Sequence, residues 1–253
     1  MRILAVAQNT FREAVRDKVL YVLLFFASVT IFGSKALGWI SIGQDIKIVK
    51  DLSLASVSVF GVLIAIFVGT SLVYKEIDKR TIYTIICRPM HRYELILGKY
   101  LGLAMLLAVV TVTMAAVATG YILLLGGSVN ATFYCAVLLI YWQLLLITAF
   151  AVLLSSLTSP ILGAIIVFMV FVAGHATGIF INLPPQFQGT ISEKVLRWVY
   201  YILPNLSNFD LSSQAANSIA APPGFVGWAL LYGTVYTALL LALASIAFED
   251  KDV

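Results

Sequence analysis

The chain has 253 residues, of which 61% are hydrophobic and 11% are charged. A water-soluble domain carries roughly a quarter charged residues, so this composition excludes an ordinary soluble globule and indicates that lipid surrounds much of the chain. The net charge of +4 would suggest nucleic-acid binding in a soluble protein. Basic residues also collect in the cytoplasmic loops of membrane proteins, so no nucleic-acid partner is expected.

Six segments are long and apolar enough to cross a bilayer. A spanning helix needs about 20 apolar residues, because each adds about 1.5 Å against a hydrocarbon core of about 30 Å. The segments run approximately over Val19–Trp39, Leu52–Tyr74, Tyr100–Leu125, Ala131–Leu154, Ile161–Asn182 and Phe225–Phe248. The sequence therefore predicts an all-α, multi-pass integral membrane protein with six transmembrane helices, in which residues 1–253 form a single domain.

The distribution of Lys and Arg predicts the orientation. If the N-terminus is cytoplasmic, eleven basic residues lie on the inner side: Arg2, Arg12, Arg16, Lys18, Lys75, Lys79, Arg80, Arg88, Arg92, Lys99 and Lys251. Five then lie on the outer side: Lys35, Lys47, Lys50, Lys194 and Arg197. Because basic residues favour the cytoplasmic side, we expect both termini in the cytoplasm, with the protein in the inner (plasma) membrane.

Residues 1–18 precede the first span and have a helical period of their own. Ile3, Val6, Ala7, Phe11 and Ala14 recur at steps of three and four residues, with charged residues between them. This pattern predicts an amphipathic helix lying in the plane of the inner membrane surface. The alternative is that any basic segment before a span has a similar pattern.

Residues 183–224 form the largest external segment. Five of the seven prolines lie here, at positions 184, 185, 204, 222 and 223, so one long helix is not expected. Trp198, Tyr200 and Tyr201 suit the depth of the lipid headgroups. We therefore expect a short interfacial or re-entrant helix within this loop.

The sequence lacks the motifs of several catalytic sites and the intramembrane carboxylates of ion-coupled transport. The sequence contains no GxxxxGK[ST] phosphate loop, no HExxH motif and no GxSxG motif, so no enzymatic site and no bound cofactor or metal is expected. No Asp or Glu lies within the six expected spans. Because intramembrane carboxylates commonly carry the coupling ion, a secondary transporter is disfavoured.

The loop of residues 75–92 is the most informative stretch. Ile77, Thr81, Ile82 and Ile85 fall on one face of a short helix. Pro89 disfavours helix at Arg88, so the chain should turn there before the third span. A short amphipathic helix between two spans would move both spans if a partner displaced it.

This loop resembles that of the permease subunits of type-2 ABC exporters. The resemblance lies in Glu76 and Thr81, then Arg88-Pro89 with Arg92, then Gly98-Lys99 at the start of the third span. The number of spans, the in-plane N-terminus and the large last external loop also agree. The chain looks closest to the stand-alone permeases of copper-enzyme maturation and sodium-efflux systems. Position 87 is Cys, where the family usually has a small Ser.

The resemblance implies roles for particular residues. A coupling helix would begin at Glu76 and dock on an ATPase, with its contacts supplied by Glu76, Ile77, Arg80, Thr81, Ile82 and Ile85. The loop would be anchored by Arg88, Pro89, Arg92 and Lys99. For Arg88, Arg92 and Lys99 the alternative is that they only set the topology.

The resemblance also implies the partners. The chain would form the substrate path of an ATP-driven exporter, between the facing second and fifth spans. It would bind cytoplasmic ABC ATPase subunits and a second permease copy, identical or related, within membrane lipids. ATP and Mg would bind the ATPase subunit. Gly174 and Gly178 form a GxxxG pattern that permits close helix approach, so they could contribute to the dimer seam. The alternatives are an ATP-independent secondary transporter and a non-transporting membrane scaffold.

Overall fold

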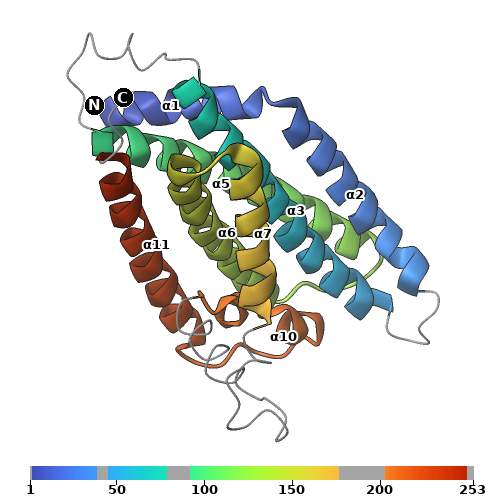
Figure 1. The fold of residues 1–253 in the computed structure, drawn as a ribbon. Coiled ribbons are helices and arrows are strands. Elements are labelled where there is room, and N and C mark those ends of the chain that lie inside the picture. The colour runs from blue at the N-terminus through green and yellow to red at the C-terminus, as the bar shows by residue number, and fades with distance from the viewer. Residues whose placement is uncertain (1, 39–44, 79–91, 177–202, 250–253) are drawn as a thin grey trace, which may run out of the picture.

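A computed structural model describes residues 2–38, 45–78, 92–176 and 203–249. These residues form α1 (Arg2–Val15), α2 (Lys18–Gly38), α3 (Asp45–Asp78), α5 (Arg92–Leu124), α6 (Ala131–Leu157), α7 (Pro160–His175), the short 3-10 helix η2 (Leu206–Phe209), α10 (Ser212–Ala216) and α11 (Phe225–Glu249). In the part of the chain that the structure describes, the fold is all-helical. Helix α1 lies at one end of the bundle, and α10 lies at the other (Figure 1).

Five of these helices are long and apolar enough to cross a membrane: α2, α3, α5, α6 and α11. They correspond to five of the six predicted spans. The remaining span was expected over Ile161–Asn182, and α7 accounts for its first part with 16 residues. Residues 177–182 lie outside the described residues, so the sixth crossing stays a prediction.

Helices α3 and α5 are much longer than their predicted spans. They have 34 and 33 residues, which at about 1.5 Å per residue gives each a length of roughly 50 Å, well beyond the hydrocarbon core of about 30 Å. The sequence prediction placed only their apolar middles. Flanking residues such as Lys75 and Glu76 are good helix formers, so the helices continue into the polar regions.

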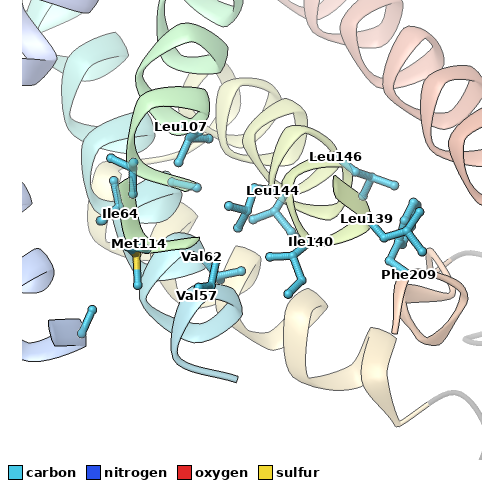
Figure 2. Packing of buried hydrophobic residues seen from close by; sticks show 14 of the residues in the cluster. Val57, Val62, Ile64, Leu107, Met114, Leu139, Ile140, Leu144, Leu146 and Phe209 are labelled. Carbon is cyan, nitrogen blue, oxygen red and sulfur yellow. The ribbon is translucent and has the colours of Figure 1, made fainter. Parts of the chain in front are cut away.

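The core lies where α3, α5 and α6 meet (Figure 2). Ile64, Leu107 and Leu144, one from each helix, are fully buried. Helix α3 approaches α6 closely at Gly61, where a Cβ would lie 2.7 Å from Leu144 Cδ1. Small residues allow helices in a membrane to approach closely and gain dispersion contacts that lipid cannot provide. The central helices therefore form a tightly packed unit.

Helices α2 and α11 lie on opposite sides of this core (Figure 1). Phe25 on α2 and Trp228 on α11 are 65% and 74% exposed. Their neighbours Phe26, Phe32, Leu231, Val235 and Leu239 are exposed as well. Apolar surfaces of this extent are rare on soluble monomers, but they suit a hydrocarbon environment. These two helices therefore present faces to lipid.

Candidate functional site

Helix α1 crosses the end of the bundle and packs on α5 (Figure 1). Its contact face contains Ala7, Thr10 and Ala14, all buried and spaced by three and four residues. The partner face of α5 contains Gly98 and Gly102. A Cβ on Gly98 would lie 2.7 Å from Val6 Cβ, and a Cβ on Gly102 would lie 2.6 Å from the Ala7 carbonyl oxygen. Only glycine allows α1 to approach α5 this closely.

The ends of α3 and α5 lie at the same end of the bundle as α1 (Figure 1). Glu76 and Ile77 belong to the last turn of α3, which continues without a break to Asp78. The prediction that a helix begins at Glu76 is therefore wrong. The apolar residues of the second span continue into Val73 and Tyr74 without a helix-breaking residue before Glu76, so α3 propagates through it.

The other predicted site residues divide into two groups. Arg80, Thr81, Ile82, Ile85, Arg88 and Pro89 lie outside the described residues. Arg92 is the first residue of α5, and Lys99 is buried in the second turn after it. Their predicted roles in ATPase contact and loop anchoring stay predictions. What the structure adds is that residues 79–91 connect two helices that both extend past the core.

An apolar groove of about 510 Å³ lies between α3 and α7. Helix α3 contributes Leu63, Ile66, Phe67 and Thr70 to its walls, and α7 contributes residues of Pro160–Met169 that include Ala164 and Phe168. Thr70 is buried, and its hydroxyl donates to the Ile66 carbonyl of the same helix. This polar residue of the wall therefore has its hydrogen-bond acceptor within α3. The groove can hold an apolar chain or a facing helix.

A family model described as "ABC-2 family transporter protein" matches residues 4–253. The chain belongs to the ABC-2 family of transporter proteins. It is accordingly the permease component of an ABC transporter, and this family does not itself hydrolyse ATP. No curated protein sequence matched the chain.

Gly174 of the permease packs within the chain. A Cβ at this position would lie 2.7 Å from Leu206 Cγ and 2.9 Å from the Pro204 carbonyl oxygen. Leu206 belongs to η2, whose Phe209 similarly packs against Gly233 of α11. Gly174 thus allows η2 to dock between α7 and α11. Gly178 lies outside the described residues, and the dimer seam stays a prediction.

Sequence reasoning missed three features of the permease. Gly102 follows Gly98 by four residues, so the GxxxG spacing was available as a signal, but nothing indicated that α1 would be the partner. The resemblance implied a path between the second and fifth spans, which correspond to α3 and α7, but no residue pattern indicated the groove or its lining. The buried Lys50 was counted only as a topology-setting charge.

Among the described residues, no three His, Cys, Asp or Glu are placed to hold a metal ion.

Proposed function

We propose that this permease is an exporter subunit that works as a dimer with a separate cytoplasmic ATPase. Residues 76–85 would receive the movement of the ATPase, and the α3–α7 groove would form part of the path for the substrate. The groove is almost entirely apolar in its lining, which suits lipidic or otherwise hydrophobic cargo.

The observation that carries this proposal is the continuity of α3. The same unbroken helix contains the groove residues Leu63, Phe67 and Thr70 and ends with Glu76 and Asp78. Thr70 and Glu76 are six residues apart, which is roughly 9 Å along a helix. A helical stretch of this length bends little. Displacement of Glu76 would therefore also displace the α3 residues that line the groove.

The charges at the end of α3 also favour a partner there. Glu76 and Asp78 place two acidic residues in its last turn, and the negative end of a helix dipole disfavours carboxylates. A basic surface on the ATPase would relieve this repulsion. Helix α1 packs on α5 at Gly98 and Gly102. This packing would hold α5 in place while the ATPase displaces the end of α3.

The exposed face of α7 supports a dimer. Ile161, Ile165 and Met169 are 74%, 46% and 61% exposed, and they border the groove. In a two-fold dimer each copy would place the same face against the other, so the two grooves would combine into one path. A related second permease could take the same position.

The test is ATPase activity in proteoliposomes that contain the permease and its ATPase subunit. Glu76→Ala should lower the permease-dependent stimulation of ATP hydrolysis severalfold, because it removes a contact at the end that the ATPase moves. The matched control is Asp51→Ala, which removes an exposed carboxylate near the opposite end of the same helix. Asp51→Ala should stimulate ATP hydrolysis by the ATPase subunit as the unaltered permease does.

Equal stimulation by Glu76→Ala and Asp51→Ala would contradict the proposed coupling role. Flux driven by an ion gradient with no ATPase present would instead support secondary transport. Purification of the permease with another membrane complex and no ATPase would support a scaffold.

A further inference from the structure

A second cavity lies at the end of the bundle opposite α1, and its lining is basic. It has a volume of about 900 Å³. It lies between the end of α2, the first turns of α3, the turn that connects α5 to α6, and residues 216–218 at the end of α10. The charged residues that line it are Lys35, Lys47, Lys50 and Asp45. Three ammonium groups therefore face one carboxylate, and the cavity attracts anions.

Lys50 is the least accessible of these groups. Its side chain is 3% exposed, and its Nζ donates to Ser218 Oγ at 3.0 Å. Within the described ranges, this hydroxyl is its one hydrogen-bonding partner, and Asp45 forms no ion pair with it. An ammonium has three N–H donors, and a buried charge is strongly unfavourable unless an opposite charge or several acceptors accompany it. Lys50 thus has donors to offer a ligand.

The residue that holds Lys50 is itself held in an uncommon conformation. Ser218 has a φ of 57° and follows α10 at the position where Gly normally ends a helix, with the Ile219 N–H bonded to the Gln214 carbonyl. Its own carbonyl accepts from Asn130 Nδ2 at 3.5 Å. Gly would fit this backbone with less strain, but it would give Lys50 no acceptor. The wall of the cavity is thereby tied to α3 and to the start of α6.

We propose that this cavity binds a phosphate group, with Lys50 as its central ligand and Lys47 and Lys35 as the surrounding cations. Lysine binds phosphate as a point charge, and several ammonium groups suit a group with more than one anionic oxygen. The cavity lies at the ends of the spans, at the depth where lipid headgroups meet water. The phosphate can therefore belong to an anionic lipid or to a soluble phosphoester. This inference does not depend on the coupling mechanism proposed above.

The experiment uses the full-length permease in detergent and has two arms. In one, glycerol 3-phosphate is titrated and binding is followed by thermal unfolding, since a ligand specific to the folded state raises its stability. In the other, native mass spectrometry compares retention of phosphatidylglycerol with that of phosphatidylcholine. Lys50→Met keeps an unbranched side chain but removes the ammonium group. It should weaken binding of the probe about tenfold or more, as expected for loss of a charged hydrogen bond. Lys18→Met, an exposed lysine at the opposite end, is the control and should bind as the unaltered chain does.

The arms separate the two sources of phosphate. An effect on glycerol 3-phosphate indicates a soluble ligand, and an effect confined to phosphatidylglycerol indicates a lipid headgroup. Equal binding by the unaltered chain and Lys50→Met, or no binding of either probe, would overturn the proposal. If Lys50→Met does not fold, Lys35→Gln replaces an exposed lysine of the same cavity and should weaken binding severalfold; unchanged binding in that variant would equally overturn it.

Discussion

Two glycines on α5 determine where the N-terminal helix lies. Residues 98 and 102 are one helical turn apart, and a Cβ on either would meet α1 at 2.7 Å or less. A larger residue would separate the two helices and remove their dispersion contacts.

Gly102→Ala should therefore destabilise the permease by about 1–3 kcal/mol, the usual cost of overpacking a well-packed contact. The added Cβ would lie 2.6 Å from a backbone oxygen of α1, which cannot move away as a flexible side chain could. Thermal unfolding in detergent is the measurement. The matched control is Gly120→Ala on the same helix, where no atom lies within 4 Å. A melting temperature that falls as much for Gly120→Ala as for Gly102→Ala would contradict the packing role.

At the scale of elements, α3 joins two segments that the sequence predicts as separate helices. The apolar span was predicted over Leu52–Tyr74, and a new helix was expected at Glu76. The structure joins them into one helix of 34 residues. Sequence periodicity could not show this, because the residues around Glu76 fit the continuation of one helix as well as the start of another.

The rigidity of this helix can be tested between the groove and Glu76. Val73→Gly combined with Tyr74→Gly should lower ATPase-coupled transport severalfold while leaving ATPase binding intact, because each glycine weakens the helix by about 1 kcal/mol relative to alanine. Val73→Ala with Tyr74→Ala removes the same side chains but preserves the helix. Coupling that is equally reduced in the alanine pair would show that the side chains matter and the helix rigidity does not.

The face of α7 provides a second test at this scale. In a chain whose Cys87 and Cys135 are replaced by Ser, Ile165→Cys should be joined to the same residue of a second copy by a short bis-maleimide, since equivalent residues near a two-fold axis approach each other. Ile165 is 46% exposed beside the groove. Leu239→Cys on α11, which is 60% exposed, should stay monomeric on a denaturing gel. If Leu239→Cys forms cross-linked dimers and Ile165→Cys does not, the dimer seam lies at α11 and not at α7.

For the whole molecule, composition and span length predicted the all-helical membrane fold and five of its long helices, because a bilayer admits few other solutions. The family was suggested by residues of the 75–92 loop and is established over residues 4–253. The packing partners were not predictable: nothing in the sequence pairs Gly102 with Ala7, Gly174 with Leu206, or Lys50 with Ser218. Such contacts depend on tertiary arrangement rather than on local pattern.

The central claim is that the end of α3 bearing Glu76 meets the ATPase in the cytoplasm. A photoreactive amino acid placed at position 76 and activated in intact cells measures this directly. We expect a covalent adduct between the permease and the ATP-binding subunit from position 76, and none from position 51 at the other end of α3. An adduct from position 51, or labelling of a cysteine at position 76 by an impermeant reagent added outside the cell, would contradict the account.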